Sequence, residues 1–223
     1  VAAARHCAAM GTGSVLATDI SPQMVALTEK ALAPIPAKTR CEVRDGQALG
    51  LEPASFDAVF SCFGIFLFPD RLAAWRSAAE VLRPGGLLIT SVWRGPEFNE
   101  LASGQMAPLM AGLPTRLTDP PPRPGWAAIT TAEGFIAEVT GAAPFAEAEL
   151  HVLNATLTLP TPADMWRGMV GNPVTGALIA ECDAEEREAV ERAVLDAFET
   201  RSGGPDRPFT LNGSCHVLVA RRM

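Results

Sequence analysis

The chain has 223 residues, of which 48% are hydrophobic and 19% charged, a composition typical of a folded globular protein. A net charge of −7 and an isoelectric point near 5.0 argue against a nucleic-acid backbone as partner, because phosphate binding needs a basic surface. The most apolar window, residues 58–68, is shorter than the ~20 residues of a spanning helix, so no membrane span is expected.

The cysteines argue for an intracellular protein without a metal site. Their number is odd, and none forms a C-x-x-C pair, which indicates neither a zinc site nor a disulfide framework. Scattered thiols suit a reducing compartment, so we expect a cytoplasmic protein. The five are Cys7, Cys41, Cys62, Cys182 and Cys215.

In the first half, helical and strand patterns alternate. The Ala-rich residues 1–10 favour a helix that Gly11 and Gly13 end, before a short strand at 14–20. The next helix, 21–32, starts with a serine cap and a proline at its first position. Further strands are predicted at 40–45, 53–64 and 87–93, and a further helix at 70–82. This alternation predicts an α/β fold, a Rossmann-like and mainly parallel sheet with helices on both faces.

The second half is predicted to carry helical insertions and to end the sheet in an antiparallel hairpin. The Pro-rich stretch at 120–126 is typical of a stiff connector. Helices are predicted at 131–142, 161–170 and 183–201, and strands at 146–159 and 208–222. We expect one domain over 1–223, with a cofactor-binding half at 1–94, a helical insertion and linker at 95–128, and a completing part at 129–223 that carries a helical insertion at about 161–201.

Several predicted strands end in residues suited to a nucleoside. Asp19 and Asp45 end the first two strands, and the third ends at Ser61, Cys62 and Phe63. The carboxyl ends of strands in such a sheet line one crevice, where ligands bind. A carboxylate there can accept both ribose hydroxyls, a second can accept from the adenine amine, and apolar neighbours can hold the ring.

Three stretches in this half resemble the class I S-adenosylmethionine-dependent methyltransferases. They are VLATDISPQMVALTEKA, EVRDGQALGLEPASFDAVFSCFGIFLFPD and AAEVLRPGGLLITSVW, in the same order and spacing as the family's motifs. They are most similar to the small-molecule group that includes the ubiquinone and menaquinone biosynthesis enzymes. The resemblance covers roughly residues 1–93 and is weaker beyond them.

The resemblance implies S-adenosylmethionine as cofactor and a role for each matching position. Asp19 would hold the ribose diol, and Ile20 and Met24 would pack on the adenine. Asp45 would accept from the adenine amine, with the backbone of Gly46 and Gln47 nearby. Cys62 and Phe63 would line the methionine end. The turn Arg83-Pro84-Gly85-Gly86 would mark the fold without touching the ligand.

The pair Gly11 and Gly13 invites interpretation as the family's cofactor loop, but its position is wrong. The loop lies before the first helix, and the ribose acid follows about 20 residues later, as in dinucleotide folds. Asp19 is only six residues beyond Gly13. We therefore expect an ordinary helix-to-strand turn here, with the glycine loop ahead of Val1.

Each candidate also has a plainer interpretation. Asp19 can simply cap the next helix, and Asp45 can be a solvated turn residue. Cys62 is interpreted as a packing residue that faces the pocket, not a nucleophile. Trp93 suits a pocket and a core equally. The histidines His6, His151 and His216 are interpreted as structural or surface residues; Met106, Met110, Trp166 and Met169 are interpreted as packing residues, with an apolar lid as the alternative.

The predicted function is methyl transfer from S-adenosylmethionine to a small, fairly apolar acceptor. Small molecules are the expected partners, the oligomeric state is open, and no catalytic base is assigned. Two alternatives stay open: an NAD(P)-dependent oxidoreductase, in which Asp19 again holds ribose, and a non-catalytic methyltransferase-like binding protein. Against the oxidoreductase, the chain has no tyrosine and so lacks the Tyr-Lys pair of one large dehydrogenase group.

Overall fold

The computed structural model describes residues 1–118 and 129–223. The predicted connector at 120–126 lies outside the described residues. The chain divides into two compact units: unit 1 comprises 1–90, 136–149 and 218–223, and unit 2 comprises 91–135 and 150–217.

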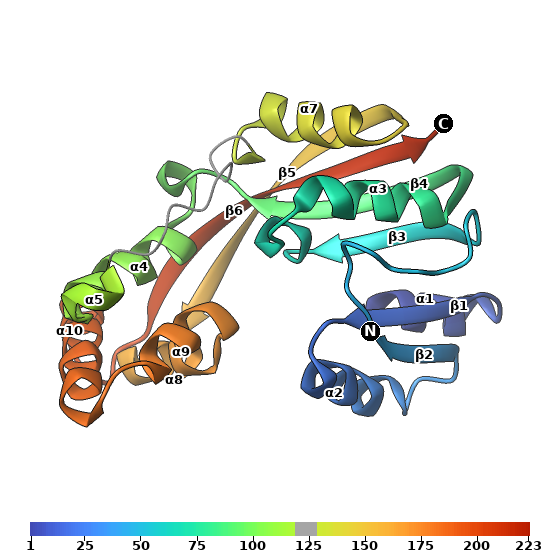
Figure 1. Ribbon diagram of the computed structural model, residues 1–223. Helices are drawn as coiled ribbons and strands as arrows, with labels where there is room; N and C mark the ends of the chain where they lie inside the picture. The colour runs from blue at the N-terminus through green and yellow to red at the C-terminus, as the bar shows by residue number, and fades with distance from the viewer. Residues whose placement is uncertain (119–128) are drawn as a thin grey trace. The chain divides into compact units, whose positions relative to one another are not determined.

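Unit 1 holds the alternating first half of the chain (Figure 1). Its elements are α1 (Ala2–Met10), β1 (Ser14–Asp19), α2 (Pro22–Leu32), β2 (Lys38–Val43), β3 (Phe56–Cys62), η1 (Ile65–Leu67), α3 (Arg71–Val81) and most of α7 (Ala132–Ala142). Three long strands contribute residues to both units: β4 (Leu82–Trp93), β5 (Phe145–Leu159) and β6 (Phe209–Arg222). Unit 2 adds η2 (Pro96–Phe98), α4 (Glu100–Gly112), α5 (Thr115–Thr118), α8 (Pro162–Gly171), α9 (Pro173–Ala180) and α10 (Ala184–Ser202).

The described strands form two sheets. β1 and β2 pair in parallel, with Asp19 opposite Val43. The other sheet has the order β3-β4-β6-β5, and Figure 1 shows β6 running opposite to β4 and β5. Parallel strands interleaved with helices, followed by an antiparallel pair, confirm the expected Rossmann-like α/β fold. The sheet is not continuous, because no described strand pairs with the free edge of β1 or of β3.

Local signals set most boundaries close to the predicted ones. The Ser21 hydroxyl accepts from the backbone N of Met24 (3.4 Å), with Pro22 at the first helical position of α2. Asp70 caps α3 in the same way through the backbone N of Ala73 (2.9 Å). These side chains satisfy donors that a helix start leaves unpaired.

The turn Arg83-Pro84-Gly85-Gly86 differs from the prediction, because it lies inside β4 instead of before it. The strand begins directly after α3, at Leu82. At Gly86, a Cβ atom would lie 3.1 Å from the backbone oxygen of Asp57. Glycine therefore lets β4 approach β3 this closely.

Unit 2 has a core of its own, to which its helices and the start of β6 contribute. The core consists of Leu109, Leu113, Met165, Trp166, Met169, Ile179, Val190, Val194, Phe198, Phe209 and Leu211. Met106 and Met110 pack against it. The packing interpretation of these methionines, of Trp166 and of Met169 is therefore confirmed. No helix among the described residues is long and apolar enough to cross a membrane.

Candidate functional site

The glycines at 11 and 13 form the turn that joins α1 to β1. Gly11 ends the helix in a left-handed conformation (φ 67°), which lets carbonyl groups at the end of the helix accept hydrogen bonds. Gly13 is also left-handed (φ 90°), and a Cβ there would lie 3.0 Å from the Sγ of Cys7. Both positions thus need glycine for the backbone itself, and the expectation of a helix-to-strand turn is confirmed.

Asp19 is the last residue of β1 and is half-buried. Its Oδ1 accepts from the backbone N of Ser21 (2.9 Å), which fixes the carboxylate above the start of α2. Ser21, not Asp19, supplies the side-chain cap of that helix. Among the described residues, Asp19 Oδ2 has no hydrogen-bond partner, so one carboxylate oxygen is available to a ligand hydroxyl.

Two apolar side chains beside Asp19 are exposed. Ile20 directly follows it and is 67% exposed, and Met24 on the first turn of α2 is 43% exposed. A β-branched and a flexible thioether side chain at one strand end form a small apolar surface next to a carboxylate. Such a pairing of polar and apolar groups suits a ligand with a hydroxylated part and a flat ring.

Asp45 lies two residues beyond β2 and takes part in a chain of side-chain contacts. Its Oδ1 accepts from the backbone N of Gln47 (2.8 Å) and from the Nε2 of the same residue (3.1 Å). The Oε1 of Gln47 accepts in turn from the backbone N of Asp70 (2.8 Å). The Gln47 side chain therefore orients Asp45 and connects it to the start of α3.

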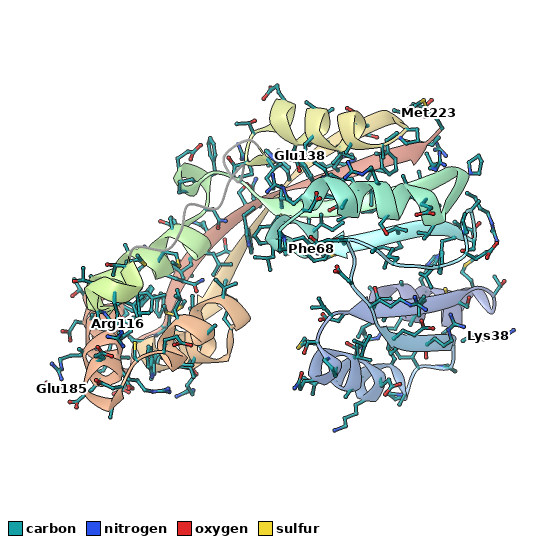
Figure 2. The ribbon with its side chains drawn as sticks, in the orientation of Figure 1. Lys38, Phe68, Arg116, Glu138, Glu185 and Met223 are labelled. Atoms are coloured by element: carbon teal, nitrogen blue, oxygen red, sulfur yellow. The ribbon has the colours of Figure 1, made fainter. Side chains whose placement is uncertain are left out.

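The loop that carries Asp45 is held at its far end as well. Arg44 donates from Nη1 to the backbone oxygen of Leu49 (2.6 Å), and the buried hydroxyl of Ser77 on α3 accepts from the backbone N of Leu49 (2.9 Å). Gly46 has no space for a side chain, because a Cβ would lie 2.6 Å from the ring of Phe68 (labelled in Figure 2). A rigid loop presents Asp45 at low entropic cost on binding.

The charge of Arg44 is directed to Glu42 and not to Asp45. Its Nε donates to Glu42 Oε2 (2.6 Å), and this hydrogen bond holds the pKa of Glu42 below its usual value. Among the described residues, no cation forms an ion pair with Asp19 or Asp45, so the end of the β1–β2 pair presents two carboxylates as hydrogen-bond acceptors.

The end of β3 carries the last two predicted residues. Cys62 ends the strand and is exposed. Phe63 has a positive φ of 52°, which is unusual for a bulky residue. The hydroxyl of Ser61 accepts from the backbone N of Ile65 (3.2 Å) and stabilises this bend. Strained backbone of this kind concentrates at functional sites.

All eight predicted site residues lie in unit 1. The ends of β1 and β2 are adjacent, since the backbone N of Arg44 donates to the backbone oxygen of Asp19 (3.0 Å). The Gln47–Asp70 contact brings the end of β2 to the segment that follows β3. Sequence reasoning missed the roles of Arg44, Ser77 and the Gln47 carboxamide. No cluster of potential metal ligands occurs among the described residues.

Comparison with known proteins shows which proteins this chain resembles. Residues 1–90 match the family model described as "Methyltransferase domain". The methyltransferase tpcH of Aspergillus fumigatus is 30% identical over 103 residues, which are 46% of this chain and 35% of that protein. An uncharacterized protein of Mycobacterium tuberculosis is 27% identical over 135 residues, or 60% of this chain and 48% of that one. The chain thus spans less than half the length of these relatives.

Solved structures show the same fold at low sequence identity. A candidate methyltransferase from Bacillus halodurans matches 98% of this chain and 87% of its own, with a TM-score of 0.59 and 16% identity. Phosphoethanolamine N-methyltransferase 2 of Haemonchus contortus, bound to S-adenosylhomocysteine, matches 97% of this chain and 45% of its own (TM-score 0.51, 17% identity). The [4+2]-cyclase SpnF matches 94% of this chain and 66% of its own (TM-score 0.50, 15% identity).

The residues that match the methyltransferase domain include the ends of β1, β2 and β3, and the shared fold agrees with this match. Residues 1–90 thus match a methyltransferase domain, and the chain shares its fold with solved structures of methyltransferases.

Proposed function

We propose that this protein binds S-adenosylmethionine at the carboxyl ends of β1, β2 and β3 and transfers its methyl group to a small, fairly apolar acceptor. The observation that carries the proposal is the half-buried Asp19. Its Oδ2 has no partner among the described residues, and exposed Ile20 and Met24 lie beside it. This is the combination that a ribose attached to a purine requires.

The residues present fit the cofactor part by part. Asp19 would accept from the ribose hydroxyls, and Ile20 and Met24 would cover the adenine ring. Asp45 already accepts from Gln47 and still has lone pairs for an exocyclic amine. Gly46 has no space for a side chain beside the ring of Phe68, and the backbone N of Gln47 donates to Asp45. These two residues therefore shape the site through the loop conformation.

The methionine end is assigned to Cys62 and Phe63. The positive φ of Phe63 turns the backbone at the end of β3, and Cys62 is exposed there. The methyl donor is already activated, so transfer needs no covalent step through a thiol. We assign Cys62 a contact role and no step in catalysis.

The chemistry needs little from the protein beyond alignment. S-adenosylmethionine supplies a methyl group activated by its positively charged sulfur. The residues of unit 1 hold the nucleoside in a fixed position, so that an acceptor can be aligned with the reacting bond. Orientation alone supplies several kcal/mol of the rate effect, roughly 7–11 in favourable intramolecular cases.

A titration of the full-length protein with S-adenosylhomocysteine tests the proposal. We expect saturable binding by calorimetry, and a loss of affinity of about tenfold or more in Asp19→Ala, because hydrogen bonds from both ribose hydroxyls to a charged group disappear. Asp57→Ala is the matched control: Asp57 lies at the start of β3 and pairs with Arg83 at the surface, so its removal should leave affinity unchanged.

Two results would contradict the proposal: absence of binding by the wild-type protein, or wild-type affinity in Asp19→Ala. Binding and turnover are measured separately, because the same fold serves a cyclase and fold does not fix the reaction. Incubation with radiolabelled methyl donor and a panel of small apolar acceptors then measures transfer directly.

A further inference from the structure

A polar cluster in unit 2 lies outside the proposed cofactor site. It consists of Arg94, just beyond β4, and of Ser214 and His216 on β6. The backbone N of Arg94 donates to the backbone oxygen of Ser214 (3.1 Å), which extends the contact between the two strands. Ser214 and His216 are two residues apart, and therefore on one face of β6, and each is only 4% exposed.

His216 has an unsatisfied polar atom. Its Nδ1 is buried and has no hydrogen-bond partner among the described residues. Buried polar groups without a partner are rare and need an explanation. Burial, and then the charge of Arg94, lowers the pKa of His216, while the more weakly acting carboxylate of Glu133 opposes this shift. The imidazole is therefore neutral at neutral pH and has one N–H to donate.

Arg94 supplies the charge of the cluster. Its Nη1 donates to the hydroxyl of Ser214 (3.2 Å), and its guanidinium carbon lies 3.8 Å from the ring centre of Phe98. No described carboxylate forms an ion pair with Arg94. A half-buried guanidinium without an anionic partner has several N–H donors in a fixed planar fork, a geometry that matches a carboxylate.

We propose that Arg94, Ser214 and His216 form a site that binds the carboxylate of a small organic acid. A carboxylate provides one oxygen for the unused guanidinium donors and one for the imidazole N–H. Its single negative charge balances the single positive charge of Arg94, whereas a phosphate dianion would leave negative charge uncompensated. The site rests on residues of unit 2 alone and goes beyond the proposed function.

The surroundings suit an aromatic or otherwise apolar acid. Phe98, which stacks on Arg94, leaves 49% of its surface exposed. A ring that carries the carboxylate can contact this exposed face while the charged group is held by Arg94. The cluster therefore fits a small organic acid with an apolar ring.

Benzoate is a suitable probe, and benzamide is its neutral control of the same shape. In full-length protein labelled with ¹⁵N-histidine, we expect benzoate to shift the ring nitrogens of His216 saturably, with His6 and His151 unchanged. His216→Gln assigns the signal. Benzamide should bind about tenfold more weakly or worse, because it lacks the charge that Arg94 recognises. No saturable shift, or equal affinity for the two probes, would overturn the assignment.

Variants of Arg94 complete the test. Arg94→Gln should weaken benzoate binding by about tenfold or more, and Arg94→Lys should bind with intermediate affinity, since it keeps the charge but not the fork. Ser214→Ala is a milder second variant if Arg94→Gln is poorly folded. The control is Arg192→Gln, which removes a surface arginine of unit 2 that pairs with Glu188. Wild-type affinity in Arg94→Gln, or an equal loss in Arg192→Gln, would contradict the proposal.

The two proposals fail separately. Binding of S-adenosylhomocysteine depends on Asp19, and binding of benzoate depends on Arg94. If benzoate does not bind while S-adenosylhomocysteine does, the carboxylate site is wrong and the cofactor site stands. If benzoate binds and S-adenosylhomocysteine does not, unit 2 has an anion site and the methyltransferase proposal is wrong.

Discussion

Gln47 shows how a neutral residue can control an acidic one. Its carboxamide donates to Asp45 and accepts from the backbone N of Asp70 (2.8 Å). Asp70 in turn caps α3 through the backbone N of Ala73. The Gln47 side chain contacts Asp45 only through its amide nitrogen, which is a donor. The contact therefore depends on the amide group and not on the size of the side chain.

We expect Gln47→Glu to weaken S-adenosylhomocysteine binding with little loss of stability. The substitution keeps the shape but places a second carboxylate against Asp45 and removes the donated hydrogen bonds, which should cost about tenfold in affinity. Calorimetry measures the affinity, and urea unfolding measures the stability.

Gln105→Glu makes the same change of charge in unit 2 and serves as the control for net charge. It should leave cofactor affinity unaltered. If Gln47→Glu binds as tightly as the wild type, Gln47 does not position Asp45; if stability falls as much as affinity, its role is structural.

At the residue scale, the sequence predicted approximately where the strands end, but it did not predict the hydrogen bonds that hold the loops after them. Asp19 was predicted as a site residue because it ends a recognisable strand; Asp45 was predicted to end the next strand and lies two residues beyond it. The contact of Gln47 with Asp70 spans 23 residues, and that of Leu49 with Ser77 spans 28. No local pattern encodes such pairs, because they depend on how α3 packs on the loop.

At the scale of elements, α10 was predicted from its amphipathic pattern, and the structure adds the signal that starts it. Asp183 and Glu186 form a capping box, in which each side chain accepts from the other's backbone N (both 2.9 Å). The sequence did not predict that Arg116 of α5 also binds Glu186. Arg116 Nη2 lies 2.6 Å from Glu186 Oε2, and its Nη1 contacts the other oxygen. This ion pair couples α5 to the first turn of α10.

The Arg116–Glu186 ion pair predicts that unit 2 loses stability in acid. The hydrogen bonds from Arg116 and then from the backbone of Asp183 lower the pKa of Glu186 from 4.5 to about 2. A carboxyl whose pKa is depressed on folding binds its proton more readily when unfolded. Its contribution to stability is therefore fully present above pH 4.5 and is lost as the pH falls toward about 2.

Urea unfolding of the wild type and of Glu186→Gln across this range checks the prediction. We expect the two midpoints to differ at neutral pH and to converge as the pH falls toward about 2. The control is Glu188→Gln, because Glu188 is exposed and forms an i,i+4 pair with Arg192. Its unfolding midpoint should depend on pH in the same way as that of the wild type. If the unfolding midpoints of the wild type and of Glu186→Gln differ by the same amount at all pH values, folding does not lower the pKa of Glu186.

At the scale of the whole molecule, unit 1 is assembled from three stretches of chain. Its first stretch, 1–90, was predicted well, because helices and strands alternate there with clear caps. The inclusion of 136–149 was not predicted, because it rests on a contact between residues 67 apart. Arg71 of α3 forms two hydrogen bonds with Glu138 of α7 (2.9 and 2.7 Å), and Trp75 Nε1 adds a third (3.0 Å; Glu138 is labelled in Figure 2).

This network should make Glu138 important to the stability of unit 1. Arg71 and Glu138 are only 11% and 14% exposed. Burial opposes ionisation of Glu138, yet the hydrogen bonds from Arg71 and Trp75 outweigh it, and the pKa of Glu138 lies below its usual value. Glu138→Gln would remove the carboxylate that pairs with the buried Arg71 guanidinium, which costs about 3 kcal/mol of unfolding free energy.

Urea unfolding gives this free energy, and two further variants separate the cause. Glu147→Gln breaks the exposed pair with Arg221 and should cost less than about 1 kcal/mol. The double variant Arg71→Met with Glu138→Leu removes both charges and should recover much of the loss, because no uncompensated ion remains. If the double variant is as unstable as Glu138→Gln, the loss comes from packing around Trp75 and not from the buried charge. Backbone hydrogen exchange in 136–142 then distinguishes detachment of α7 from unfolding of the whole unit, since only detachment would accelerate exchange there and leave α3 protected.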